Sequence, residues 1–473
     1  MPKHGVYVTE QGTSVRTPAA VETGIPFVIG LSPVHAADKP AVAGVPVLCQ
    51  NFADFEEAFG YIEDYATYNL CEFAYSHFQL FGQQPAIFCN LLDPSTMKSA
   101  VAAADKDVTG KKIELTVKAI DDSGLVVKAA GGNGNAYVKD TDYSVYYNAD
   151  GKLVIEVLSG GAIYSATSLN VAYNEVTPAS VNASAVATGL EKIELCMTMV
   201  GVIPDLIVAP GFSQNSTVAA VMATKAAGIN GMFKAKALID IDASSVTTYT
   251  AAITAKGTNN FTDKNEIVCW PMLKLGDKKF HFSTQLAGLI ATVDGEYGAP
   301  YVSPSNKGLK CDALILADGS EVVMSLDNAN TLNANGIVTC LNFMGGFKAW
   351  GNYTACYPAS NDVKDYLIPV KRMFDWTNNT LIRTFWNNLD DPMNRLLIDS
   401  IVDSANIWMN GMTGSGYILG GRVEYSEAEN PLTNLMAGII KLHVYITPPS
   451  PAQEIDFVLE YDASYVEEAL SAT

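Results

Sequence analysis

The sequence predicts a multidomain chain that combines the α/β and α+β classes. Its 473 residues are enough for about three domains at roughly 150 residues each. Buried-type strands alternate with amphipathic helical segments in residues 21–94 and again in 191–353, which is typical of a parallel sheet covered by helices. Between them, residues 95–190 change to short period-two runs separated by turn residues, which predicts an inserted β-rich domain.

The composition excludes several function classes. Lys and Arg total 30 and Asp and Glu total 50, so the formal net charge is −20. Nucleic acids and anionic membrane surfaces both favour a basic protein face, so we expect neither as a partner. No apolar run reaches the 18 or so residues of a membrane span, and the start of the chain lacks the apolar stretch of a secretory signal.

The first twenty residues are predicted to form an N-terminal arm. Residues 5–10 (GVYVTE) alternate as a β-strand does, and Val6, Tyr7 and Val8 form its centre. The polar residues 11–14 separate this strand from the first segment of the core.

The discontinuous core, residues 21–94 and 191–353, is predicted from alternating helices and strands. We expect strands at residues 25–30, 85–92, 205–209, 233–241, 266–270, 312–316, 321–324 and 337–343. We expect helices at residues 52–59, 69–81, 217–228 and 246–256. The insert is predicted to have strands at residues 112–118, 125–129, 143–147 and 153–157.

The end of the chain is predicted to form an α+β domain, residues 354–447, followed by a C-terminal arm, residues 448–473. We expect helices at residues 362–376, 380–388 and 393–409, and strands at residues 417–425, 438–447 and 454–461. The arm begins with the proline-rich residues 448–451, and residues 454–473 contain six acidic residues and no basic ones.

No pattern of catalytic or ligand-binding residues is present, so we expect no cofactor, metal site or catalytic residue. The five histidines are isolated, and the phosphate-binding and nucleophile motifs are absent. The eight cysteines are widely spaced among apolar neighbours, which indicates reduced thiols and makes disulfides the weaker alternative. Asp240 and Asp242 end a predicted parallel strand, where α/β enzymes place their sites, but no partner residue supports catalysis there.

Four stretches resemble contractile tail sheath proteins of myophages and phage-tail-like bacteriocins. The first comprises GVYVTE (5–10), TGIPFVIG (23–30) and FADFEEAFG (52–60). In mid-chain, QLAGLIATVDG (285–295) is followed by PSN (304–306), and LNANGI (332–337) is followed by WGNYT (350–354). The last stretch is PPSPAQEI (448–455). The resemblance covers residues 1–93 and 191–473 and leaves the insert unmatched.

The resemblance implies a structural subunit rather than an enzyme. Such subunits form a homo-oligomer, a helical sheath of stacked six-fold rings, which contracts to drive a tail tube through a cell envelope. The implied partners are the tail tube protein and the baseplate and tail terminator proteins, in a virion or tail-like particle assembled in the bacterial host cytoplasm. The alternatives are another self-assembling protein, of the surface-layer or capsid-like kind, and an enzyme on the α/β core.

The two arms are expected to link neighbouring subunits by strand exchange. A strand at an arm is marginal alone but can donate main-chain hydrogen bonds to an open sheet edge. In the C-terminal arm, Ile455, Phe457, Leu459 and Tyr461 share one face of such a strand. We expect residues 442–446 to accept it, with Leu442, Val444 and Ile446 on one face. The alternative is that both arm strands pair within their own chain.

A tube contact is expected in residues 371–395, which are slightly basic within an acidic domain. The basic residues are Lys371, Arg372, Arg383 and Arg395. Such a segment suits a charge-complementary contact with a tube. An ordinary solvated helix face is the alternative.

Overall fold

The computed structural model describes residues 22–471 and is built on one large, largely parallel sheet. The strand order is β18-β17-β13-β12-β11-β1-β3-β2. Its strands are β1 (Pro26–Gly30), β2 (Val47–Cys49), β3 (Ala86–Asn90), β11 (Leu206–Val208), β12 (Lys236–Asp240), β13 (Glu266–Cys269), β17 (Ile337–Asn342) and β18 (Phe347–Trp350). Only the two edge strands, β2 and β18, run antiparallel to their neighbours. The central strands are buried along their length, as expected for a sheet covered on both faces.

Helices cover this sheet and create the main apolar core. They are α1 (Phe52–Phe59), α2 (Asn69–Ala74), α3 (Ala183–Gly189), α4 (Cys196–Met199), α5 (Ser216–Ala227), α6 (Tyr249–Thr258), α7 (Phe282–Tyr297) and α8 (Leu326–Asn333). A polar side chain caps the start of several of them; for example, the Asn51 side chain accepts a hydrogen bond from the backbone N–H of Asp54 at 3.0 Å. Helix α7 is buried over most of its length.

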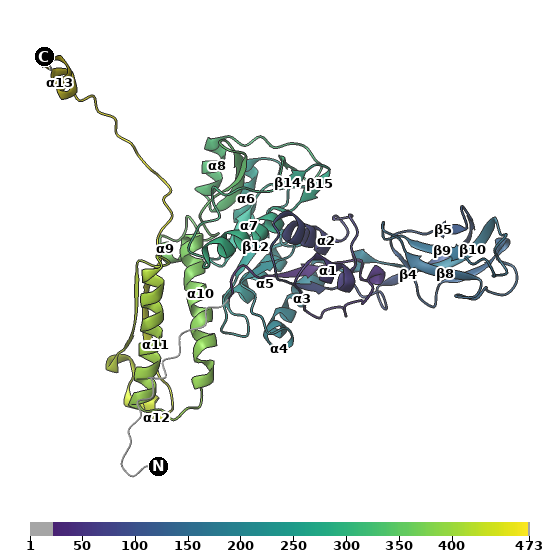
Figure 1. Cartoon of the computed structure of the whole chain (residues 1–473), viewed down its shortest axis with the longest axis horizontal. Helices are drawn as coiled ribbons and strands as arrows, with labels where there is room; N and C mark the ends of the chain where they lie inside the picture. Colours follow the sequence, from purple (N-terminus) through teal and green to yellow (C-terminus); the bar gives the residue numbers. More distant parts are fainter. Residues whose placement is uncertain (1–21, 472–473) are drawn as a thin grey trace, which may run out of the picture.

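Residues 98–176 form two small antiparallel sheets that project from the body (Figure 1). One consists of β4 (Lys98–Asp107), β6 (Ala119–Ile120), β7 (Val126–Ala129) and β10 (Ser168–Val176). The other consists of β5 (Lys112–Glu114), β8 (Tyr143–Tyr147) and β9 (Leu153–Val157). They enclose a core of their own, which includes Leu153, Ile155 and Val171. The two longest strands, β4 and β10, were not expected from the sequence.

A third small sheet lies beside the large one, with β14 (Met272–Leu275) between β15 (Lys278–Phe280) and β16 (Ala313–Ile315). The strand expected at residues 321–324 is wrong, because only Glu321 forms a bridge, to Ile315. Val323, two residues later, is 90% exposed, so the segment turns away from the sheet.

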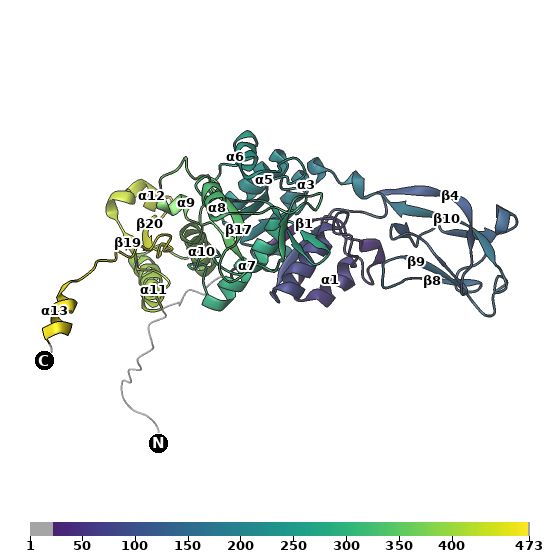
Figure 2. The same cartoon turned by 90° about the horizontal axis from the view of Figure 1, so that it is seen from above.

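The C-terminal part consists of helices packed against a two-stranded sheet. Its elements are α9 (Val363–Tyr366), α10 (Ile368–Phe385), α11 (Arg395–Gly414), β19 (Gly420–Tyr425), α12 (Leu432–Met436), β20 (Leu442–Thr447) and α13 (Ser464–Ser471). The two helices expected at 362–376 and 380–388 divide differently, because α10 continues through residue 380. Figure 2 shows this part, the helix-covered sheet and the projecting sheets in a row.

The whole is a mixed α/β fold with one large sheet and several small antiparallel ones. Among the residues that the structure describes, no helix is both long enough and apolar enough to cross a bilayer.

Candidate subunit-linking surface

The two-stranded sheet of β19 and β20 pairs antiparallel over six residue pairs, from Gly420–Thr447 to Tyr425–Leu442. Within residues 22–471, neither strand pairs with any other strand. One face lies on an apolar cluster whose members include Trp408, Met409 and Val423. The sheet is therefore anchored on one face, and its two edges differ in what covers them.

The edge of β19 is closed by helix α11. The Asn406 side chain donates a hydrogen bond to the Val423 carbonyl at 2.9 Å and accepts one from the Val423 N–H at 2.8 Å. Both main-chain groups of Val423 therefore point away from β20, and the pair Val423–Val444 is not directly hydrogen-bonded. A strand from another molecule would have to displace Asn406 to pair there.

The edge of β20 is the open one. Main-chain groups alternate in direction along an antiparallel strand, so those of Leu442, Val444 and Ile446 point away from β19. The main-chain groups of the intervening residues point toward β19. At Lys441, just before β20, the Asn430 side chain donates a hydrogen bond to the main-chain carbonyl at 2.8 Å and accepts one from the N–H at 2.7 Å. The three residues expected to accept a strand are thus the ones with unpaired main-chain groups.

The C-terminal arm leaves β20 at Pro448 and makes no strand with its own chain. Residues 452–471 are exposed, and Phe457 and Leu459 are 85% and 95% exposed. The strand expected at 454–461 is therefore absent from the isolated chain, because the arm runs away from the body (Figure 1). Within residues 22–471, the segment pairs with no strand of its own chain, so the described residues give no support to the alternative of pairing within the chain. Val6, Tyr7 and Val8 of the N-terminal arm lie outside the described residues.

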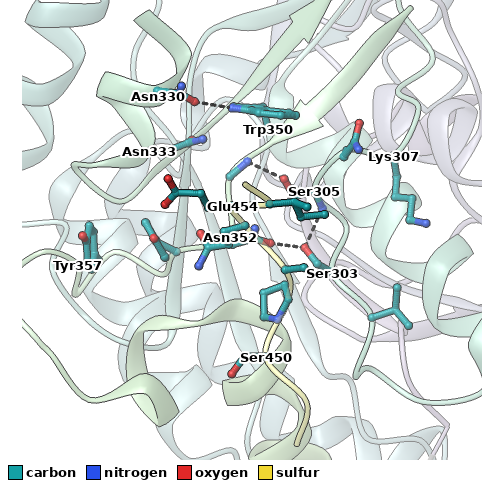
Figure 3. Close-up of a pocket in the computed structure, with 18 of the residues that line it drawn as sticks. Ser303, Ser305, Lys307, Asn330, Asn333, Trp350, Asn352, Tyr357, Ser450 and Glu454 are labelled. Atoms are coloured by element: carbon teal, nitrogen blue, oxygen red, sulfur yellow. Dashed lines mark hydrogen bonds between the residues drawn. The ribbon is translucent and has the colours of Figure 1, made fainter. Parts of the chain in front are cut away.

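The root of the arm crosses a groove of about 990 Å³ (Figure 3). Its walls come from distant parts of the sequence. Ser303 and Ser305 lie between α7 and β16, Asn330 lies in α8, and residues 350–353 begin at the last residue of β18. Trp350 donates its indole N–H to Asn330 at 3.0 Å, and the Gly351 N–H bonds Ser305 Oγ at 3.0 Å. Ser303 also donates to Asn352.

Three segments from the stretches that resemble sheath proteins meet in this groove: PSN (304–306), LNANGI (332–337) and WGNYT (350–354). The last stretch, PPSPAQEI (448–455), passes over it. These separated motifs therefore lie together at the point where the arm begins.

Two of the four basic residues expected to contact a tube are inside the molecule, which corrects that prediction. Arg372 is 3% exposed and bonds Asp294 at 2.8 Å and Asp205 at 2.9 Å. Lys371 is 8% exposed and pairs with Asp375 one turn along α10. Both cations neutralise buried carboxylates and are unavailable to another protein.

The ion pairs of Arg372 join α10 to the core. Burial alone would lower the pKa of its guanidinium, but Asp294 and Asp205 raise that pKa above its usual value. The residue therefore stays charged. Arg383 and Arg395, by contrast, are exposed, and Arg395 pairs only with the nearby Asp399.

Asp240 and Asp242 use their carboxylates locally. Asp240 is buried and accepts hydrogen bonds from the Ser283 N–H at 2.8 Å and from Ser213 Oγ at 3.1 Å. Asp242 accepts from Ser244 and Ser245 in the turn that follows β12. These bonds fix the start of α7 and a tight turn. No group of three metal-ligating side chains occurs in residues 22–471.

A partly buried histidine beside Asp240 is a feature that the sequence did not reveal. His281 bonds Glu72 at 2.8 Å, and although burial lowers its pKa, Glu72 and then Asp240 raise it to about 9. The histidine is charged at neutral pH and balances these carboxylates. His281 and Glu72 are 209 positions apart in the sequence, which explains why no local motif signals the pair.

The chain is similar in sequence and in structure to tail sheath proteins. No protein-family model matches it. It is 26% identical over 494 aligned residues to the tail sheath protein of Burkholderia phage BcepMu, covering 98% of this chain and 97% of that one. Among solved structures, it resembles the sheath of an extracellular contractile injection system (PVC) in its contracted state, with a TM-score of 0.59, 14% identity and coverage of 98% and 99%. It also resembles the sheath tail protein of Listeria innocua, with a TM-score of 0.51, 14% identity and coverage of 93% and 94%.

Proposed function

Because the chain belongs to the contractile tail sheath family, we propose that it polymerises as stacked six-fold rings around a tail tube and contracts to drive that tube through a cell envelope. It is a structural subunit of a phage tail or tail-like contractile particle, not an enzyme. Its further partners in this proposal are the tail tube, baseplate and tail terminator proteins, and assembly takes place in the bacterial host cytoplasm.

The observation that carries the proposal is the match between the open edge of β20 and the free arm. Within residues 22–471, the main-chain groups of Leu442, Val444 and Ile446 lack a strand partner, and residues 455–461 form no strand. An extended segment that adds to a sheet edge gains main-chain hydrogen bonds along its length. In a polymer, the arm of one subunit satisfies the edge of the next.

The division of labour in the chain follows from this arrangement. Residues 21–94 and 191–353 are the sheath core, residues 95–190 face outward, and residues 354–447 carry the acceptor strand. The arms, residues 1–20 and 448–473, link subunits. Arg383 and Arg395 remain as the tube contact, because both are exposed near the turn between α10 and α11.

The C-terminal arm is tested by polar substitutions on one face of its strand. We expect Phe457→Asp with Leu459→Asp to abolish the hollow tubes that negative-stain electron microscopy detects for the full chain. Val458→Asp is the matched control, because Val458 is equally exposed at 92% but lies on the opposite face of the strand. If the double variant still forms tubes, strand donation by this arm is wrong.

The N-terminal arm is tested by deleting residues 1–12. The expected product is a soluble subunit that does not polymerise. Long sheaths from this variant would contradict arm exchange through Val6, Tyr7 and Val8. Hollow tubes also separate a sheath from a surface-layer protein, which forms flat arrays.

A further inference from the structure

The C-terminal arm does not end with its donated strand, because helix α13 follows it at Ser464–Ser471. The Asp462 carboxylate accepts a hydrogen bond from the Ser464 N–H at 2.9 Å and starts the helix. Tyr465, Val466, Ala469 and Leu470 occupy one face, and Glu467 and Glu468 lie on the other.

The apolar face of α13 is uncovered in the isolated chain. Tyr465 is 70% exposed and Leu470 is 79% exposed. A helix of eight residues is marginal in water without a surface to pack on. The helix therefore requires a partner to be stable, and the partner must offer an apolar surface.

Helix α12 offers such a surface at one end of the two-stranded sheet of β19 and β20, called here the acceptor hairpin. Leu432 and Met436 lie one turn apart and are 71% and 81% exposed, and Ile439 just after the helix is 55% exposed. The loop that carries α12 is fixed by the two hydrogen bonds between Asn430 and Lys441. Exposed apolar side chains that cluster on a fixed element mark an interaction site.

The direction of the donated strand decides whether α13 reaches α12. Strand β20 runs away from α12, so a strand added antiparallel to its open edge runs back toward α12. Residues 455–461 are about as long as the six residues of β20, so α13 would emerge beside α12. A parallel strand would carry α13 to the opposite end of this two-stranded sheet, where Leu419, the residue just before β19, is 69% exposed.

We propose that α13 of one subunit docks on α12 of a second copy of this chain, as a helical latch behind a strand added antiparallel to β20. Tyr465 and Leu470 pack on Leu432 and Met436, and the glutamates of α13 face the solvent. This inference rests on the proposed function, because it requires the arm to bind a neighbouring subunit. It adds a second, side-chain contact to the main-chain contact of the strand.

The direct test is a cysteine pair in the full-length chain, Met436→Cys with Leu470→Cys. Assembled sheaths are treated with oxidised glutathione, which takes up two electrons as two thiols lose their protons and form one S–S bond, and are then run on a denaturing gel without reductant. A ladder of covalently linked subunits is expected. Each single variant serves as a control for the native cysteines, seven of which are buried.

The matched pair is Leu419→Cys with Leu470→Cys, which reports the opposite strand direction. This pair is expected to give no ladder. A ladder here, or none from Met436→Cys with Leu470→Cys, would overturn the latch. In either case, arm exchange itself would stand as long as the Phe457 and Leu459 double variant fails to assemble.

A second readout is deletion of residues 462–473, which removes α13 but keeps the strand. We expect tubes to form, but the subunit concentration at which they appear should rise about tenfold, equivalent to about 1.4 kcal/mol. Glu467→Ser in the full chain, on the polar face of α13, should leave that concentration unchanged. If the deletion has no effect, α13 makes no contact in the sheath.

Discussion

Helix α10 and the C-terminal arm both lie in the last quarter of the chain, yet they are attached in opposite ways. Arg372 of α10 is 3% exposed and is held by carboxylates of the core. Leu459 of the arm is 95% exposed and pairs with no strand within residues 22–471. The difference separates a helix tied into the core from an arm whose contacts we propose to lie in another molecule. Substitutions at α10 should therefore affect folding, and substitutions in the arm should affect assembly.

The largest effect on folding is expected at the buried junction. Arg372→Met leaves Asp294 buried without its cation, and breaking a buried pair in this way costs about 3–5 kcal/mol in the free energy of unfolding. Urea unfolding of dilute, unassembled subunits measures the loss. The control is Arg395→Met, whose exposed pair with Asp399 is worth about 0.3–0.5 kcal/mol. Equal losses for the two variants would mean that the junction is no stronger than a surface pair.

A pH titration is expected to affect the body and not the arm. The pKa of His281 is raised from 6.5 to about 9. The stabilisation that charged His281 gives the folded state is therefore complete below pH 6.5 and is lost as the pH rises toward 9. The free energy of unfolding should fall by up to about 3 kcal/mol over that range. His281→Gln should remove this slope, while deletion of residues 452–473 should leave it unchanged. An arm deletion that flattens the slope would contradict the separation.

A smaller effect is expected at the root of the arm. Pro449→Gly gives the free arm more conformations to lose when it binds a neighbour, a cost of about 0.4–1 kcal/mol. The concentration needed for assembly should rise several-fold, as measured by sedimentation, while urea unfolding of the subunit stays the same. Ala452→Gly, at an exposed position three residues further along the arm, is the control for the introduction of a glycine itself. A loss of subunit stability with Pro449→Gly would show that the arm root is part of the folded body.

The smallest effect is expected at the proposed tube contact. Arg383→Glu with Arg395→Glu should weaken co-sedimentation of the sheath with purified tube, by about 0.2–1 kcal/mol for each exposed charge. The loss should be larger at low salt, because salt screens exposed charges. Tube-free sheaths should form normally. Unchanged co-sedimentation at low salt would remove these arginines from the tube contact.

Buried-type apolar runs predicted most of the central sheet, and the alternation of apolar and polar residues predicted β19 and β20. It did not predict β4, because Lys98–Asp107 is rich in alanine and charge and has little strand propensity. Its strand conformation comes from pairing with β10, a partner about seventy residues away. Where pairing with a distant segment decides the conformation, local pattern carries little information.

The basic residues of α10 show a second limit of the sequence. Lys371, Arg372 and Arg383 look alike in a count of charge, yet the first two are buried and the third is exposed. The difference depends on Asp205 and Asp294, which lie 167 and 78 residues from Arg372. The role of Asn406, which closes the β19 edge of the two-stranded sheet, also could not be predicted, because it depends on α11 packing beside β19. The expectation that β20 accepts a strand stays a prediction, although its outward main-chain groups have no strand partner within residues 22–471.

Amide hydrogen exchange on free subunits and on assembled sheaths tests the central claim most directly. In free subunits, residues 454–461 should exchange as fast as an unfolded chain, and the buried residues of α10 should be protected. In sheaths, residues 454–461 and the outward amides of Leu442, Val444 and Ile446 should become protected together. Protection of the arm in free subunits, or its absence in sheaths, would contradict the account.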